Sequence, residues 1–268
     1  MQLTRRSARR LLAAALFLSL IAVPASAQLS VNPSEIQLVP GSTPAASFTV
    51  GNDDRNPVQA NLYLNDWVRN EVGENQFEAI GSLPGSCGDR VEVFPLTIRV
   101  APGVSQAVRV SLKATDTLRT PCWTIVFVET APRPSTSNVR VSHVTRLGVK
   151  VYVTPAGAVQ DAEIAGFGAE PIMARAGIPA DSTRREFAVY VRSTGGLQVR
   201  VSGQIEIRRP NNSLAMTVPI RETPILPGST RRIAVDLPTL PSGRYVALAV
   251  VGFGGQDDLA AQAEITIP

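Results

Sequence analysis

The sequence predicts an all-β protein with two β-sandwich domains in tandem, and three observations lead to this prediction. Short segments in which apolar and polar residues alternate recur along the chain. Proline and glycine turns separate them at about the spacing of a sandwich, and no segment has a convincing helical period. About 240 residues remain after a predicted N-terminal signal, a length that suits two domains better than one.

Residues 1–27 have the organisation of a secretory signal peptide. Four arginines within residues 5–10 precede an apolar run over residues 11–23, and Ala25-Ser26-Ala27 forms a cleavage site. We therefore expect a cleaved signal, export to the periplasm and a soluble mature chain. The Arg5-Arg6 pair leaves both the twin-arginine and the general export route open. The apolar run is shorter than the roughly 20 residues of a membrane-spanning helix, so the sequence predicts no membrane insertion.

The positive charge of the chain comes from this signal. The formal net charge is +4, and the signal holds four arginines and no acidic residue, so the mature chain is formally neutral. Binding to nucleic acid or to an anionic membrane needs a basic patch, and the sequence predicts neither partner. The remaining arginine pairs lie at the ends of predicted strands, where we expect them to be solvated: Arg184-Arg185, Arg208-Arg209 and Arg231-Arg232.

The first half begins with a predicted strand over residues 29–39. Pro33 interrupts it, which suits an edge position, because proline has no N–H to donate to a neighbouring strand. The run over residues 122–128 is more continuously apolar, and we expect a central, buried strand there. The other early strands are predicted over residues 46–50, 58–68, 91–100 and 107–112. Four aromatic residues are expected to fill the core: Trp67, Phe94, Trp123 and Phe127.

Residues 139–155 form the longest alternating stretch, and the chain is organised around it. Arg146 and Lys150 have one parity. Apolar residues have the other parity, namely Val139, Val141, Leu147, Val149, Val151 and Val153. At about 3.3 Å per residue, a single strand would run roughly 45–50 Å, and Pro155 removes an N–H where pairing should stop. We expect this strand to finish one domain and to lead into the next.

The second half repeats the pattern of short strands and proline or glycine turns. Strands are predicted over residues 162–167, 185–192, 199–208, 214–220, 231–237, 245–253 and 261–267. About seven strands per half are typical of the immunoglobulin-like sandwich. We place the boundary near Pro155, which gives a signal over residues 1–27, an N-terminal immunoglobulin-like domain over residues 28–155 and a C-terminal one over residues 156–268. The short hinge predicts an angled pair with a cleft between the domains.

Catalytic chemistry has little support in the sequence. His143 is the only histidine, and by parity it shares a face with Val141 and Leu147, where packing or contact with a partner is expected. The acidic pairs Asp53-Asp54 and Asp257-Asp258 lack the spaced ligands of a calcium loop. No glycine-rich turn joins a strand to a helix, as nucleotide binding requires. We therefore expect no enzyme activity, no cofactor and no metal site.

Cys87 and Cys122 are the only cysteines. Export to an oxidising compartment makes a disulfide between them the default expectation. Two free thiols or half a metal site are the alternatives. Neither has support, since the chain has one histidine and no Cys-x-x-Cys spacing.

Four motifs resemble the periplasmic pilus-assembly chaperones, a family with two immunoglobulin-like domains. The motifs span about residues 29–155. They are L-S-V-N-P-S-E-I-Q-L-V-P-G from Leu29, V-F-P-L-T-I-R-V-A-P-G-V-S-Q-A-V-R-V from Val93, C-W-T-I-V-F-V-E-T-A-P from Cys122 and V-K-V-Y-V-T-P from Val149. The resemblance implies a chaperone that holds an exported subunit with an incomplete sandwich. It also points to an outer-membrane usher as a further partner.

The resemblance also implies which residues bind. In that family the long strand lends alternate side chains to the subunit, and a lysine in the cleft binds the subunit's C-terminal carboxylate. Carried over residue by residue, the likeness places the lysine at Lys150 and the donor side chains at Val141, His143, Thr145 and Leu147. In this mode, main-chain pairing supplies affinity and the charged bond fixes the register.

The sequence departs from the family at two places. The family's first-strand arginine maps to Glu35 or Ile36, and no basic residue occurs between Gln28 and Val50, so the two-point anchor is incomplete. His143 and Thr145 stand where the family has bulky aliphatic donors, and they offer less apolar area. A structural or adhesive two-sandwich module of an envelope or surface assembly is the alternative function.

Overall fold

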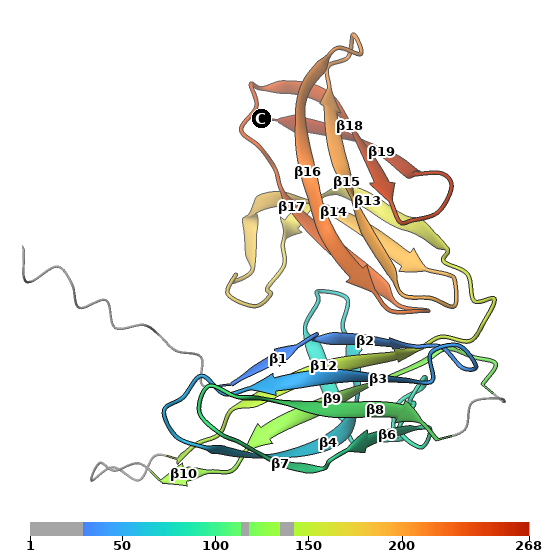
Figure 1. Cartoon of the computed structure of the whole chain (residues 1–268). Helices are drawn as coiled ribbons and strands as arrows, with labels where there is room; N and C mark the ends of the chain where they lie inside the picture. Colours follow the sequence, from blue (N-terminus) through green and yellow to red (C-terminus); the bar gives the residue numbers. More distant parts are fainter. Residues whose placement is uncertain (1–28, 114–117, 135–141, 268) are drawn as a thin grey trace, which may run out of the picture.

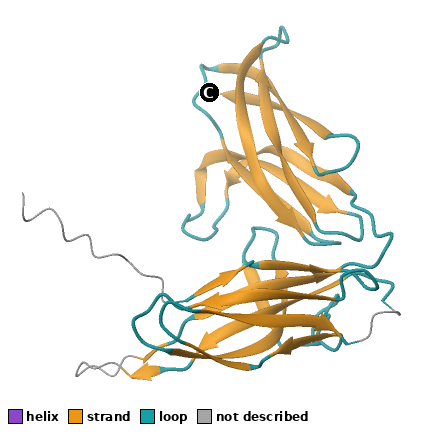
Figure 2. Ribbon diagram, in the orientation of Figure 1, coloured by secondary structure: helices purple, strands orange, loops and turns teal. Residues whose placement is uncertain are grey.

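The computed structural model describes residues 29–113, 118–134 and 142–267. Within these ranges the chain forms strands β1 to β19 and no helix, as Figures 1 and 2 show. The predicted all-β class is therefore confirmed. The predicted signal peptide lies outside the described residues.

The first domain consists of two facing sheets. One has the order β1-β3-β8-β6. Its strands are β1 (Ser30–Asn32), β3 (Ala45–Gly51), β8 (Ser105–Leu112) and β6 (Val91–Phe94). The other has the order β2-β12-β9-β4-β5, and a further strand, β7, also pairs with β4. Its strands are β2 (Glu35–Leu38), β12 (Arg146–Val153), β9 (Cys122–Thr130), β4 (Val58–Arg69), β5 (Asn75–Glu78) and β7 (Thr97–Val100).

Two predicted strands of this domain pass from one sheet to the other. The first is interrupted at Pro33, and its halves β1 and β2 lie at sheet edges, which confirms the prediction. The single strand predicted over residues 91–100 is wrong. Pro95 has no N–H to continue the pairing, so β6 stays in one sheet and β7 joins the other. Strand β5 was not predicted, because its four residues are all exposed and carry no burial pattern.

The core of the first domain is built mainly from valine and leucine rather than from aromatic residues. Phe48 is the only aromatic side chain among its buried members in the described chain. The prediction of an aromatic core is wrong, since Phe94 is 75% exposed. A separate cluster on the other face of the sheet contains Trp67, Ile125, Phe127, Tyr152 and Leu226, with Trp123 packed against it.

Strand β9 explains how the two clusters coexist. Val126 and Val128 belong to the core, whereas Ile125 and Phe127 belong to the second cluster. Successive strand residues point to opposite faces, so a continuous apolar run is what a strand buried on both faces requires. The prediction of a central, buried strand is confirmed, because β9 lies between β12 and β4.

A disulfide joins Cys87 and Cys122, whose Cα atoms are 5.1 Å apart. It ties the loop before β6 to the first residue of β9. Both side chains are buried in the core of the first domain. The bond is the pairing that the sequence favours.

The long strand predicted over residues 139–155 is not continuous. Its described part forms β11 (Ser142–His143), which pairs with β10 (Arg133–Pro134), and then β12. His143 pairs with Arg133, and Arg146 pairs with Glu129. The three residue steps from 143 to 146 therefore oppose four residue steps from 133 to 129, and this one-residue shift in register breaks the strand. Pro132 and Pro134 lack the N–H groups that would hold a regular ladder here. Residues 139–141 lie outside the described residues.

The second domain is also a pair of sheets. One has the order β13-β14-β17 and the other the order β16-β15-β18-β19. The strands are β13 (Ala162–Ile172), β14 (Asp181–Ser193), β15 (Val199–Arg208), β16 (Leu214–Ile225), β17 (Thr230–Asp236), β18 (Gly243–Gly252) and β19 (Leu259–Ile267). Each of the seven predicted strands has a counterpart. No described sheet combines strands from before and after residues 154–161, and we propose the domain boundary within this connection.

The β4–β5 hairpin of the first domain contacts the second domain, as Figure 1 shows. The Arg232 N–H donates to the Glu71 carbonyl oxygen at 2.9 Å. The Arg231 guanidinium donates to the carbonyl oxygens of Asn70 at 3.3 Å and Glu71 at 3.1 Å. Leu226 of the second domain packs into the cluster around Trp67. The two domains are therefore joined by packing and hydrogen bonds as well as by the connecting chain.

Candidate functional site

Strand β12 has a half-open edge. Strand β2 pairs with it in parallel, but only over residues 150–153. The Lys150 N–H donates to the Ser34 carbonyl oxygen at 2.9 Å, so the backbone groups of Lys150 point toward β2. Because these groups alternate in direction along a strand, those of Gly148 and Arg146 point the same way. No described strand pairs with them on that side.

The backbone groups of Thr145 point the other way, toward β9. Its carbonyl oxygen accepts a hydrogen bond from the Thr130 N–H at 2.9 Å. Its N–H donates to the Thr130 Oγ1, also at 2.9 Å. The odd-numbered backbone groups thus face β9, and the even-numbered groups of Arg146 and Gly148 remain available for a further strand.

The structure places the predicted donor residues in different situations. Leu147 is partly buried and packs against the core of its own domain. Thr145 is partly buried between β11 and β12. His143 lies in β11, and the structure describes its backbone pairing alone. Val141 lies outside the described residues. Lys150 is on β12, one residue beyond the open segment.

Lys150 lies in a partly desolvated, positively charged environment. Its side chain is 20% exposed, and its Nζ is 3.6 Å from the Glu35 Oε1. The same Nζ lies 4.9 Å from the centre of the Trp67 ring. Burial lowers the pKa of Lys150, and the charge of Arg69 lowers it further, while Glu35 partly offsets both. An additional carboxylate beside this ammonium group would therefore be stabilised.

Glu35 connects Lys150 to the second domain. In the register of β2 and β12, Glu35 is the residue opposite Lys150. Its carboxylate also accepts a hydrogen bond from the guanidinium of Arg200, which lies on β15. Arg200 is further paired with Glu222 at 3.0 Å. Of the two residues to which the expected arginine maps, Glu35 is thus an acid that faces Lys150, and it pairs with a cation from the other domain.

Sequence reasoning missed Arg200. It lies 165 residues from Glu35 in the chain, and nothing in the local pattern of β15 marks it. The one sequence feature that could have indicated a second cation is Glu35. An acid facing the expected lysine invites a second cation, but the sequence does not say which arginine supplies it.

A cleft of about 450 Å³ lies between the domains beside this cluster. Glu35 and Trp123 line it from the first domain, and Gln198 and Arg200 line it from the second. Tyr152 also lines it, and its buried hydroxyl has no hydrogen-bond partner within the described chain. Burial raises the pKa of Tyr152, and the charge of Glu35 raises it further. The cleft therefore offers the Arg200 cation to a ligand.

Within residues 29–113, 118–134 and 142–267, no three His, Cys, Asp or Glu side chains are grouped so that they could hold a metal ion. Across the same residues, no helix is long and apolar enough to cross a membrane.

Comparison with known proteins gives structural matches only. No protein-family model matches the chain, and no curated protein matches it. A chain from a chaperone–tip adhesin complex, described as vital for synergistic activation of CFA/I fimbriae biogenesis, matches with a TM-score of 0.51 and 11% identity. The match covers 88% of this chain and 98% of that one. The chain therefore has the two-domain β-sandwich fold of a fimbrial chaperone.

Two further structures have lower scores. The class 5 fimbriae chaperone CfaA is 12% identical, with a TM-score of 0.49 over 90% of this chain and 99% of that one. The other is the CsuC–CsuE chaperone–tip adhesion subunit pre-assembly complex from archaic chaperone-usher Csu pili of Acinetobacter baumannii. Its matching chain is 10% identical, with a TM-score of 0.48 over 88% of this chain and 98% of that one.

Proposed function

We propose that the protein is a periplasmic chaperone that binds an exported, pilus-type subunit by adding β12 to the subunit's incomplete sandwich. The observation that carries this proposal is the half-open edge of β12 beside Lys150. The likeness in fold to a chain of a chaperone–tip adhesin complex supports it. Export by the predicted signal would bring the chain to the compartment where such subunits are found.

The recognition would combine three contributions. The free N–H and C=O groups of Arg146 and Gly148 would pair with an extended strand of the subunit. Side chains at Val141, His143 and Thr145 would enter its core, whereas Leu147 would contribute less because it packs against its own domain. Lys150 would bind the C-terminal carboxylate through a charge-assisted hydrogen bond, which fixes the register.

Binding a carboxylate at Lys150 requires the cluster to rearrange. Glu35 already neutralises Lys150 and Arg200, so an incoming carboxylate would displace it or share the cations with it. A carboxylate that is one-third exposed is only weakly held by such a pair, because water screens the attraction. Exchange of Glu35 for the subunit's carboxylate is therefore energetically accessible.

The same cluster is the observation that favours the alternative. If Glu35, Lys150 and Arg200 serve only to hold the domains together, the chain would be a structural or adhesive module of an envelope or surface assembly. Such a module would fractionate with its assembly. A chaperone would instead be recovered in soluble one-to-one complexes.

The experiment is co-expression of the chain with each small exported subunit that is encoded beside its gene, followed by size-exclusion chromatography. We expect a soluble one-to-one complex. Arg146→Pro removes an N–H that faces the open edge and should abolish the complex, since proline is tolerated at edges but cannot donate. Arg146→Ala keeps that N–H and is the matched control. If both variants form the complex as well as the parent does, pairing along β12 is not the mode of binding.

A further inference from the structure

A second open strand edge lies on the other domain. Strand β17 is the last strand of its sheet. The Arg232 N–H donates to the Glu71 carbonyl oxygen of the first domain at 2.9 Å, so it points away from β14. By the same alternation, the backbone groups of Ala234 and Asp236 point outward. No described strand pairs with them.

A groove of about 500 Å³ follows this edge. Six consecutive residues of β17, residues 231–236, line one side of it. Strand β16, which is the edge strand of the facing sheet, lines it with residues that include Val218 and Arg221. Val72 of the β4–β5 hairpin also lines the groove. The groove therefore begins next to the hydrogen bond between the Arg232 N–H on β17 and the Glu71 carbonyl oxygen of the first domain.

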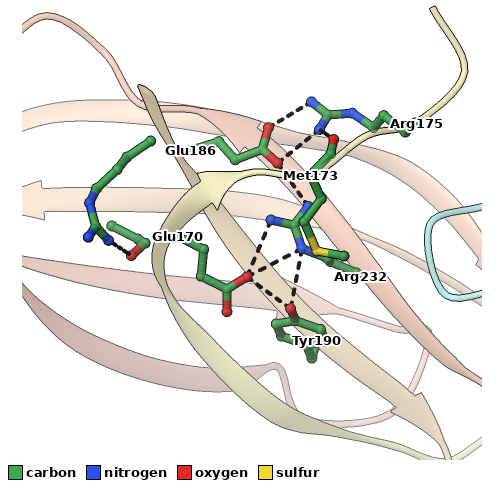
Figure 3. Close-up of polar contacts among 8 residues, drawn as sticks. Glu170, Met173, Arg175, Glu186, Tyr190 and Arg232 are labelled. Atoms are coloured by element: carbon green, nitrogen blue, oxygen red, sulfur yellow. Dashed lines mark hydrogen bonds and ion pairs between the residues drawn. The ribbon is translucent and has the colours of Figure 1, made fainter. Parts of the chain in front are cut away.

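Four arginines line the groove, and two of them are neutralised. Figure 3 shows the network that does this. The Glu186 carboxylate accepts hydrogen bonds from Arg175 at 2.8 and 2.7 Å and from Arg232 at 2.9 Å. Arg232 also contacts Glu170 at 3.3 Å, and Tyr190 donates to the same carboxylate at 2.9 Å. These charges are satisfied within the domain.

The other two arginines lack an acidic partner among the described residues. The Arg231 guanidinium donates to the carbonyl oxygens of Asn70 and Glu71 and packs against Gly73, and its Nε is buried without a hydrogen bond in the described chain. Burial and the charge of Arg69 lower the pKa of Arg231 to about 10. The Arg221 side chain makes no described ion pair and is exposed. The groove lining therefore holds two arginines without an ion pair among the described residues, Arg221 and Arg231, against one carboxylate, Asp236, which leaves a net positive charge beside free backbone groups.

These features select for one kind of strand. Positive side chains beside an open edge repel a basic strand and give no advantage to a neutral one. They favour an extended segment with acidic side chains at alternate positions, because alternate residues point to the same side. We propose that the groove between β16 and β17 binds an extended acidic segment of a partner protein, which adds to the edge of β17. This site is independent of the one on β12.

The test uses a synthetic peptide of alternating glutamate and valine, blocked at both ends, and its counterpart with lysine in place of glutamate. Binding is followed by the amide ¹⁵N–¹H shifts of the full mature chain. We expect saturable shifts at Ala234 and Asp236 with the glutamate peptide, and at least tenfold weaker binding of the lysine peptide. Binding should weaken as salt is raised, because the attraction is electrostatic.

Matched variants make the test specific. Arg221→Ala should weaken binding of the glutamate peptide by roughly two- to fivefold, as an exposed ion pair does. Arg209→Ala, an exposed arginine in the β15–β16 turn, should leave it unchanged. The proposal is overturned by any of three results: no saturable binding, equal binding of both peptides, or shifts confined to Arg146 and Gly148.

Discussion

Two carboxylates in this molecule each pair with two cationic side chains, but one carboxylate is buried and the other is partly exposed. Glu186 bridges Arg175 and Arg232 in the second domain, and its side chain is 1% exposed. Glu35 bridges Lys150 and Arg200 at the cleft between the domains, and its side chain is 33% exposed. Burial decides what each can do. The first is fixed, because its carboxylate and the guanidinium of Arg232 are both buried from water. The second is reached by water, so we expect that an external carboxylate can compete with it.

Removal of the two acids should therefore have very different effects on stability. Glu186→Ala removes the buried acidic partner of Arg232 and leaves the more exposed Glu170 as its remaining acid, and we expect a loss of about 3–5 kcal/mol in the free energy of unfolding. Glu35→Ala should cost less than about 1 kcal/mol. Urea denaturation of both variants measures the difference. If both variants lost the same free energy of unfolding, the Glu186 and Glu35 clusters would not differ in the way described here.

The disulfide is the next largest effect, and it lies only in the first domain. The bond closes a loop with a sequence separation of 35 residues. Replacing both Cys87 and Cys122 by alanine should destabilise the first domain by roughly 3–4 kcal/mol in the chain-entropy model. Glu186→Ala should instead affect the second domain. Urea denaturation of the double variant measures this loss. Mass spectrometry of the unreduced mature chain checks the bond itself, and two free thiols would contradict the account.

Partner affinity tests the exchangeable cluster directly. Lys150→Ala should weaken binding of the subunit by about 1.5–3 kcal/mol, the range for a hydrogen bond to a charged group. The exposed Lys113 is a matched lysine in the same domain, and Lys113→Ala should bind normally. Calorimetric titration with the subunit measures the affinity of both variants. Unchanged affinity in Lys150→Ala, with an unchanged melting temperature, would make Lys150 a surface charge with no role in binding.

The smallest effect is the pH dependence of the buried cluster. Burial alone raises the pKa of Glu186, but hydrogen bonds and charges from Arg175 and Arg232 outweigh it and hold the pKa below its ordinary value. A depressed pKa in the folded state means that this stabilisation is complete above the ordinary glutamate pKa of about 4.3. It is lost as the pH falls through the folded-state value.

Glu186→Gln cannot titrate, so its stability should fall less than that of the parent as the pH is lowered. Denaturation midpoints of this variant and the parent, compared between neutral and acidic pH, provide the measurement. An unchanged difference between the two proteins across the range would show that Glu186 does not titrate in this way.

The sequence predicted the strands of the second domain well, because alternation and proline or glycine turns are local signals. It failed where the fold depends on distant residues. Pro95 sends β7 into the other sheet, which alternation cannot reveal. Arg232 was expected to be solvated at a strand end, yet it is 3% exposed, because Glu186 and Glu170 come from β14 and β13.

The candidate site was predicted only in part. Parity and the family resemblance indicated Lys150, and the missing arginine was visible in the sequence. Two features were not accessible. The half-open edge depends on how far β2 reaches along β12, and Arg200 comes from the other domain. Both are properties of the assembled molecule and not of any local pattern.

Amide hydrogen exchange along β12 tests the central claim most directly. In the free chain, the N–H groups of Arg146 and Gly148 should exchange rapidly, whereas those of Leu147 and Val149, which face β9, should be protected. Addition of the subunit should protect Arg146 and Gly148 and leave the other two unchanged. If Arg146 and Gly148 stay unprotected in a complex that has formed, the subunit does not bind by strand addition to β12.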